Sequence, residues 1–236
     1  MTLFNDCSAA IQMPASDYRR FQHVMPGVDA LYLSLRAICD AELADGARIL
    51  IVGAGGGREI EALAVSDHDF LLTGVDPSAD MLAVAQHYVA AASAETRVAL
   101  IQGLTTDLTG DAEYDAAAAM LVMHFLPDDG SKLAFLQEIR ARLKRGATYL
   151  HADVCFASRT QFDAYAKAMR EHAGLVGLAE IADAPAQAIA KLAFDGDTRC
   201  IVSEERTAEL FGEAGFHLVA PIYRGLWYAG WWLEAV

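Results

Sequence analysis

The residues best suited to hold a ligand are four glycines within the five-residue segment Gly53-Ala-Gly-Gly-Gly57. Glycine tolerates positive φ angles and lets a ligand approach the backbone closely. Asp76 lies 23 residues beyond Gly53, at the end of the next apolar run. A carboxylate there can accept hydrogen bonds from both hydroxyls of a ribose. The loop and the acid together predict a nucleoside-binding crevice, although a glycine-rich turn alone is also typical of a tight strand-to-helix connection.

Two histidines are candidate proton acceptors, because imidazole titrates near neutral pH. His124 follows directly after an apolar run that we expect to be a strand, and a loop histidine bonded to the backbone is the alternative. His151 and Asp153 are two residues apart in the next expected strand, so their side chains share one face of the sheet. That spacing allows a catalytic pair or a structural hydrogen bond, and the sequence leaves both open.

Short apolar runs alternate with amphipathic stretches along most of the chain, which is the pattern of a parallel sheet with helices between its strands. Two further runs close the chain, with only Arg224 and Gly225 between them, and so short a connection requires antiparallel strands. We therefore predict an α/β fold with a mostly parallel sheet and a C-terminal antiparallel hairpin. The expected strands are 48–53, 70–75, 97–102, 114–121, 148–154, 216–223 and 226–235.

The same patterns divide the chain into four segments. Residues 1–44 are expected to form a helical cap, with one helix over 17–44, and residues 45–155 the ligand-binding α/β core. Within the core, Gly146 is expected to end a helix over 130–145. Residues 156–202 show two helical patterns and no strand pattern, which indicates a helical insert packed on the sheet. Residues 203–236 complete the core with a helix and the hairpin.

The spacing of the glycines separates two classes of cofactor. A dinucleotide fingerprint needs its third glycine at position 58, where this chain has Arg58. Residues 49–57 (ILIVGAGGG) and 74–82 (GVDPSADML) instead resemble the first two motifs of the class I S-adenosylmethionine-dependent methyltransferases. Further segments resemble that family in the same order, so the resemblance covers the core and the C-terminal segment. These segments are 114–128, 143–146 and 214–216.

The resemblance implies a Rossmann-like sheet of seven strands with the last strand antiparallel and helices on both faces. It also implies S-adenosylmethionine as the methyl donor and S-adenosylhomocysteine as the product. In such enzymes the glycine loop approaches the methionine part of the donor, the acid binds the ribose, and apolar side chains enclose the adenine. Carried onto this chain, the donor-binding residues are Gly53, Ala54, Gly55, Gly57, Asp76, Pro77, Met81, Gly103, Leu104 and Met120.

Two parts of the chain depart from the family pattern. Many relatives carry an acid directly after the third strand, whereas this chain has Gly103 and Leu104, with Asp107 three residues later. Whether Asp107 reaches the adenine is open, so we expect adenine recognition to rest on backbone groups and on packing by Leu104. Residues 156–202 match no family motif. We expect them to cover the acceptor together with the N-terminal helix, and basic residues of this cover could neutralise an anionic acceptor. The candidate cover residues are Tyr18, Arg20 and Arg199.

Composition excludes several classes of partner. The chain has 32 acidic and 18 basic residues and a net charge of −14, so we expect no nucleic-acid binding. No apolar run approaches the roughly 18 residues of a membrane helix, and residues 1–14 lack the basic start of a signal peptide. The four cysteines form no CxxC pair, so no metal site is predicted. We expect a cytoplasmic protein, and the sequence leaves open whether it forms a homodimer.

The function that these observations favour is in-line methyl transfer to a small-molecule acceptor, with His124 or His151 as the base if the acceptor must lose a proton. Two alternatives stay open. One is an NAD(P)-dependent oxidoreductase on a related sheet, against which Arg58 argues. The other is a family member that binds the donor without transferring its methyl group.

Overall fold

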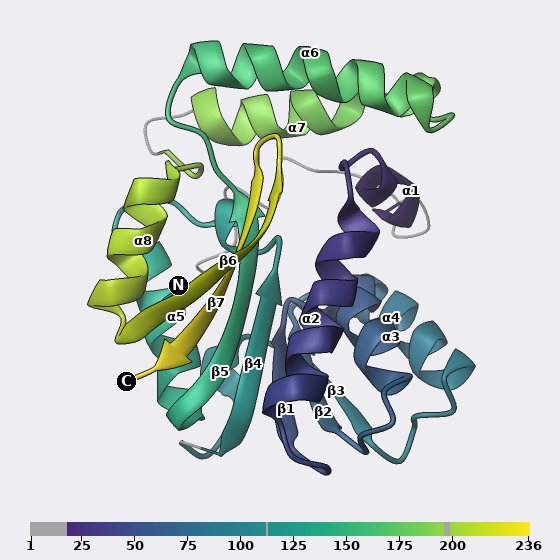
Figure 1. The fold of residues 1–236 in the computed structure, drawn as a ribbon, viewed down its shortest axis with the longest axis vertical. Helices are drawn as coiled ribbons and strands as arrows, with labels where there is room; N and C mark the ends of the chain where they lie inside the picture. Colours follow the sequence, from purple (N-terminus) through teal and green to yellow (C-terminus); the bar gives the residue numbers. More distant parts are fainter. Residues whose placement is uncertain (1–17, 112, 196–198) are drawn as a thin grey trace.

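The central element of the fold is one seven-stranded sheet, in the order β3-β2-β1-β4-β5-β7-β6 (Figure 1). The computed structural model describes residues 18–111, 113–195 and 199–236. β1 to β5 run parallel, while β7 pairs antiparallel with both β5 and β6. This topology confirms the predicted parallel sheet with its terminal hairpin. The strands are β1 (Arg48–Val52), β2 (Leu71–Asp76), β3 (Val98–Gln102), β4 (Tyr114–Met120), β5 (Leu143–Val154), β6 (Phe216–Gly225) and β7 (Tyr228–Ala235).

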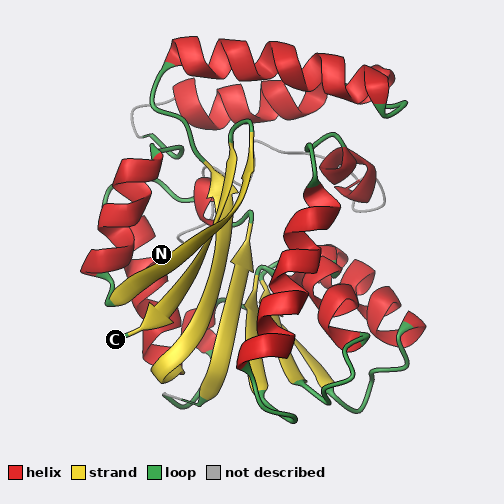
Figure 2. Cartoon of the chain, in the orientation of Figure 1, coloured by secondary structure: helices red, strands yellow, loops and turns green. Residues whose placement is uncertain are grey.

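Helices cover both faces of the sheet (Figure 2). On one face lie α2 (Val28–Glu42), α3 (Arg58–Ala64) and α4 (Ala79–Ala91), and on the other lie α5 (Ser131–Arg142) and α8 (Glu204–Glu213). The remaining helices are α1 (Tyr18–His23), α6 (Arg159–Leu175) and α7 (Asp183–Phe194). Single 3₁₀ turns occur at η3 (Ala54–Gly56), η4 (Thr105–Asp107), η5 (Met123–Phe125) and η6 (Ala179–Ile181).

The strand β1 shows why the parallel strands read as continuous apolar runs. Successive side chains of a strand point to opposite faces. Ile49 and Ile51 therefore join the apolar cluster that contains α2 and α3, while Leu50 and Val52 join the cluster that contains α5 and α8. All four side chains are buried. A strand covered on both faces needs apolar residues at every position.

Three boundaries differ from the expectations. The N-terminal helix is broken into α1 and α2, because Pro26 lacks an N–H group and Gly27 has a φ of 71°. The helix α5 ends at Arg142, so Gly146, with a φ of 79°, lies within β5 and does not end the helix. The hairpin turns at Leu226, with a φ of 54°, rather than at Arg224 and Gly225.

The insert and α1 lie beyond the carboxyl ends of the parallel strands (Figure 1). Phe162 of α6 stacks on Trp227 at the hairpin tip, with ring centroids 5.6 Å apart and an interplanar angle of 10°. His172 of α6 donates a hydrogen bond from Nδ1 to the carbonyl of Val24 at 3.0 Å. These contacts connect the insert to the C-terminal hairpin and to the segment between α1 and α2. None of the described helices is long and apolar enough to cross a membrane.

Candidate functional site

The glycine loop turns the chain from β1 into α3. Gly53 and Gly57 have φ angles of 76° and 67°, and the 3₁₀ turn η3 lies between them. The N–H of Gly53 donates to the carbonyl of Val75 at 2.9 Å, which fixes the loop against the end of β2. The left-handed backbone at both ends explains why glycine is required there.

Asp76 is tied to this loop by its side chain. Oδ2 accepts a hydrogen bond from the N–H of Gly55 at 3.0 Å, and Oδ1 accepts one from the N–H of Ser78 at 2.8 Å. Burial raises the pKa of Asp76, and the two backbone donors partly offset this effect. Each carboxylate oxygen keeps a lone pair beyond its backbone donor, so both can accept from ribose hydroxyls.

Protein atoms fill the space where side chains at Gly55 and Gly57 would lie. A Cβ on Gly55 would lie 2.7 Å from Oδ2 of Asp76 and closer still to Cβ of Met81. A Cβ on Gly57 would lie 2.6 Å from the ring of Tyr88. Contacts this short do not occur between real Cβ atoms and their neighbours. Close packing of α4 against the loop therefore requires these glycines, in addition to the ligand approach that the sequence suggests.

The carboxylate of Asp107 lies against the end of β3. Its Oδ2 accepts a hydrogen bond from the N–H of Leu104 at 2.8 Å, and a Cβ on Gly103 would lie 2.7 Å from the same oxygen. The carboxylate thus folds back to the first residues after the strand, and its contact with adenine stays open. The N–H of Gly103 donates to the carbonyl of Asp76 at 3.0 Å, which joins this turn to Asp76.

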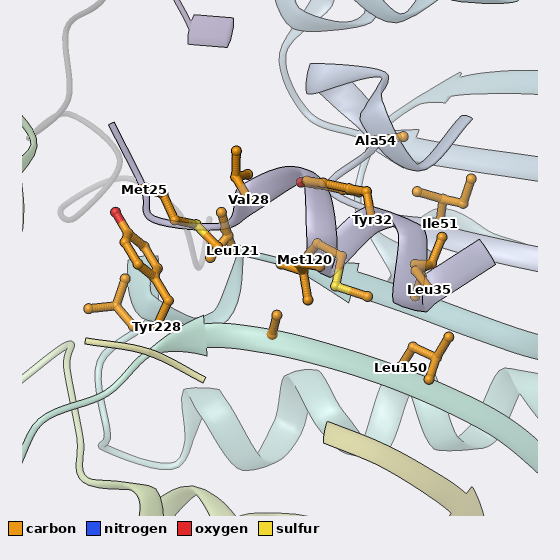
Figure 3. Packing of buried hydrophobic residues seen from close by; sticks show 14 of the residues in the cluster. Met25, Val28, Tyr32, Leu35, Ile51, Ala54, Met120, Leu121, Leu150 and Tyr228 are labelled. Atoms are coloured by element: carbon orange, nitrogen blue, oxygen red, sulfur yellow. The ribbon is translucent and has the colours of Figure 1, made fainter. Parts of the chain in front are cut away.

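The apolar donor-binding candidates separate into two groups. Met81 and Leu104 are half-buried and Pro77 is exposed, as side chains at the rim of a crevice would be. Met120 and Ala54 are buried in the cluster that packs against α2, where Figure 3 shows Met120 among Tyr32, Leu35 and Ile51. In this structure α2 covers Met120, so its expected place beside the donor stays a prediction.

At the far end of the site, His124 pairs with Asp153. Nδ1–H of His124, in η5, donates a hydrogen bond to Oδ1 of Asp153, in β5, and both side chains are buried. Oδ1 also accepts from the N–H of Val154 at 2.8 Å. Burial opposes the ionisation of Asp153, but the charge and hydrogen bond of His124 outweigh it and lower the pKa of this carboxyl. The pair occupies Nδ1 of His124, so Nε2 is the ring nitrogen left to accept a proton.

His151 takes a different role from the one its spacing allowed. It is fully buried, with Nδ1 hydrogen-bonded to Oη of Tyr149 at 2.7 Å. Nε2 lies 3.8 Å from Oδ2 of Asp153, too far for a hydrogen bond. Burial lowers the pKa of His151 to about 4, so the ring is neutral near pH 7. Asp153 therefore pairs with His124, and the rings of Phe211 and Trp231 pack against His151.

Lys132 belongs to the same cluster, and sequence reasoning missed it. The residue is only 1% exposed, and its ammonium donates to the carbonyl of Met123 at 2.7 Å. Burial lowers the pKa of Lys132 to about 8, and the charge of Asp153 opposes this shift. A lysine at the start of an amphipathic helix normally reads as a surface residue. Here it holds the turn that carries His124.

The backbone before His124 is strained. Leu121, between β4 and η5, has a φ of 63° and is buried, and its N–H donates to the carbonyl of Ala152 at 2.7 Å. A left-handed conformation costs a non-glycine residue roughly 1–2 kcal/mol. Such strain is concentrated at functional sites, where surrounding contacts hold it in place. Here the strained residue turns the chain so that His124 reaches Asp153.

Of the cover residues that the sequence singled out, two belong to α1 and one lies between α7 and α8. Tyr18 begins α1, and its side chain is outside the described part of the structure. Arg20 of α1 forms an ion pair with Glu180 of η6, which links the N-terminal helix to the insert. Arg199 is exposed, and its carbonyl accepts from the N–H of Asp128 at 2.9 Å.

Residues 49–146 match the protein family described as a methyltransferase domain. No curated protein matches the chain. Among solved structures, a SAM dependent methyltransferase from Aquifex aeolicus aligns with 95% of this chain and 100% of its own, at 16% identity and a TM-score of 0.63.

Two further structures broaden the comparison. The 1,6-didemethyltoxoflavin-N1-methyltransferase of Burkholderia thailandensis, with bound 1,6-didemethyltoxoflavin and S-adenosylhomocysteine, aligns over 100% of this chain and 92% of its own, at 20% identity and a TM-score of 0.57. The cyclase SpnF aligns over 88% and 82%, at 17% identity and a TM-score of 0.62. At such identities the likeness shows the fold alone. The indication of methyl transfer comes from the family match over residues 49–146.

Proposed function

We propose that this chain, which carries a class I S-adenosylmethionine-dependent methyltransferase domain over residues 49–146, methylates a small-molecule acceptor at the His124 end of its site. The observation that carries the proposal is the hydrogen bond between His124 and Asp153, beyond the carboxyl ends of β4 and β5. Ligands of open parallel sheets bind at that edge, near the reversal of strand order. The methyltransferase domain overturns the NAD(P)-dependent alternative.

The glycine loop, Asp76 and the turn after β3 fit the donor. Both oxygens of Asp76 can accept from ribose hydroxyls, and Asp107 with Leu104 would lie at the adenine. When bound, S-adenosylmethionine supplies a methyl group that is already activated by its positively charged sulfur. The protein's main contribution is then to hold donor and acceptor in line.

His124 would act as the general base for an acceptor that carries a hydroxyl or an amine. Because Nδ1–H donates to Asp153, Nε2 is the basic nitrogen of the neutral ring. Nε2 would take the acceptor's proton as the acceptor becomes the nucleophile. Asp153 would stabilise the imidazolium that forms, since its carboxylate is buried and ionised.

The N-terminal helices and the insert would cover this end of the site. Three contacts hold them in place: the Arg20–Glu180 ion pair, the hydrogen bond from His172 to Val24, and the stacking of Phe162 on Trp227. A cover that excludes water would strengthen the electrostatics of the pair beneath it. A pocket closed in this way favours a small acceptor over a macromolecule.

The charges of the cover argue for an acceptor without an anionic group. Four of the cations that could have neutralised one are in ion pairs with neighbouring acids. These pairs are Arg19–Glu61, Arg20–Glu180, Arg159–Asp163 and Arg170–Asp183. The other three cations of the cover are Lys167, Lys191 and Arg199. Pairing of the four arginines weakens the case for a carboxylated acceptor, and we propose a neutral acceptor.

A transfer assay with radiolabelled donor tests the proposal. The wild type should label members of a panel of neutral hydroxyl- and amine-bearing small molecules, and it should not label tRNA. His124→Asn should lower kcat by roughly 100-fold or more, because general-base catalysis typically contributes that much. His217→Asn, at an exposed histidine of β6, is the matched control and should leave kcat unchanged. Unchanged turnover in His124→Asn would contradict the role of this base.

A further inference from the structure

A buried arginine beside the glycine loop has unused hydrogen-bond donors. Arg58 follows Gly57 directly, and its side chain is only 6% exposed. It forms an ion pair through Nη2 with Asp29 of α2, and its guanidinium lies 4.5 Å from the centre of the Tyr32 ring. Nε and Nη1 are buried and make no hydrogen bond to any described residue.

Such donors call for a physical explanation. Buried N–H groups are paired in the great majority of cases, and a charged group without its full set of partners loses stability. Asp29 is mostly exposed, so it satisfies one nitrogen from the solvent side and leaves the buried ones unpaired. A ligand that brings an anionic oxygen to the loop would supply the missing acceptor.

The surroundings make this cation necessary for an anionic ligand. The loop is flanked by the acids Glu59, which is buried, and Asp76. A carboxylate entering this acidic neighbourhood would be repelled unless a cation faced it. Arg19 of α1 is already paired with Glu61. Arg58 directly follows the loop and keeps two nitrogens unpaired among the described residues, so it can face such a carboxylate.

We propose that Arg58 binds the α-carboxylate of S-adenosylmethionine through a nitrogen that the protein leaves unpaired. The inference rests on the donor placement proposed above, in which the methionine part lies at the glycine loop. Tyr32 and Asp29 position the guanidinium from α2, and Figure 3 shows Tyr32 beside Ala54 of the loop. Arg58 thus occupies the position where the dinucleotide fingerprint has its third glycine, and there it would bind the amino-acid end of S-adenosylmethionine.

Two ligands that differ only in this carboxylate test the proposal by calorimetry: S-adenosylmethionine and its decarboxylated form. The wild type should bind the carboxylated ligand about 10- to 100-fold more tightly, which is the usual effect of a charged hydrogen bond. Arg58→Gln should remove this preference, because it should lower the affinity for S-adenosylmethionine and leave the affinity for the decarboxylated form unchanged. Arg58→Lys, which keeps the charge, should lose less than Arg58→Gln.

Arg142 provides a matched control, because it is also buried with an unpaired Nε but binds Gly110 and Asp111 away from the loop. Arg142→Gln should keep the wild-type preference. Equal affinity of the wild type for the two ligands overturns the assignment of Arg58. So does a result in which Arg58→Gln and Arg58→Lys each lose as much affinity for the decarboxylated ligand as for S-adenosylmethionine. A wild type that binds neither ligand overturns the donor placement with it.

Discussion

The two ends of the proposed site, a donor end at the glycine loop and an acceptor end at His124, are built in different ways. At the donor end, Asp76 is held by backbone N–H groups of Gly55 and Ser78, which are close to it in the fold and lie within one strand–helix–strand unit. At the acceptor end, His124, Lys132 and Asp153 come from a turn, a helix and a strand, and they hold one another by buried charges. The first arrangement depends on glycine and backbone geometry, and the second on long-range packing of side chains.

Gly55→Val should produce the largest effect and should break the donor end alone. A Cβ at this position would lie 2.7 Å from Asp76 Oδ2 and would displace Met81, so both the ribose acceptor and the α4 packing would shift. We expect S-adenosylhomocysteine binding to fall below detection in calorimetry. Gly212→Ala, where a Cβ meets nothing within 4 Å, is the control and should bind normally. Wild-type affinity in Gly55→Val would show that the loop does not hold the donor.

Asp153→Asn should break the acceptor end alone. The amide cannot stabilise an imidazolium as the carboxylate does, so kcat should fall by roughly 100-fold while donor affinity stays within about twofold. Steady-state kinetics together with calorimetry separate the two quantities. A loss of donor affinity equal to the loss of kcat would mean that Asp153 maintains the fold of the whole site.

The pH dependence of stability should have opposite signs at the two ends. Burial raises the pKa of Glu59 to about 7 from 4.5, so the unfolded state ionises first and stability falls as pH rises from 4.5 to 7. Burial lowers the pKa of His151 to about 4 from 6.5, so the unfolded state is protonated first and stability falls as pH drops from 6.5 to 4. Each effect amounts to about 3 kcal/mol, and the two oppose each other in the wild type.

Single variants separate these opposing effects. In Glu59→Gln, urea unfolding should show stability that rises with pH between about 4 and 6.5. In His151→Asn, stability should instead fall as pH rises between about 4.5 and 7. Parallel pH profiles for the wild type and both variants would contradict the buried ionisations at both ends.

The ion pair that links the N-terminal helix to the insert should produce the smallest effect. Arg20 and Glu180 are both more than half exposed, so Glu180→Gln should change the free energy of unfolding by at most about 1 kcal/mol. If the pair also steadies the cover, kcat/KM should fall by no more than about fivefold, and high salt should remove the difference. A loss of tenfold or more would mean that closure depends on this pair.

The arrangement of the glycine loop around Asp76 was predictable from sequence because its signals are local, while its role in donor binding stays a prediction. The glycines, Asp76 and the capping Ser78 lie within one βαβ unit, and apolar periodicity places each of them. The strands were also recognisable, since buried parallel strands are apolar at every position. The break at Gly27 and the turn at Leu226 were missed, because the sequence pattern there does not reveal which residue takes the left-handed conformation.

The acceptor end was predictable only in part. His124 stood out by its place after a strand, but no side-chain partner was predicted for it, since alternation along β5 placed Asp153 on the same face as His151. Spacing within one strand cannot reveal a contact between η5 and β5. The burial of Lys132 and Arg58 was not predicted, because a charged residue in an amphipathic helix is normally exposed and only long-range packing buries these two. The burial and the partners of these residues depend on contacts between segments that are far apart in the sequence.

The most direct test of this division of the site compares S-adenosylhomocysteine affinity in Asp76→Ala and His124→Asn by calorimetry. We expect a loss of about 1.5–3 kcal/mol for Asp76→Ala, the range for a hydrogen bond to a charged group, and no loss beyond about twofold for His124→Asn. Asp76→Ala with wild-type affinity, or His124→Asn with the larger loss, would contradict the division of the site into a donor end and an acceptor end.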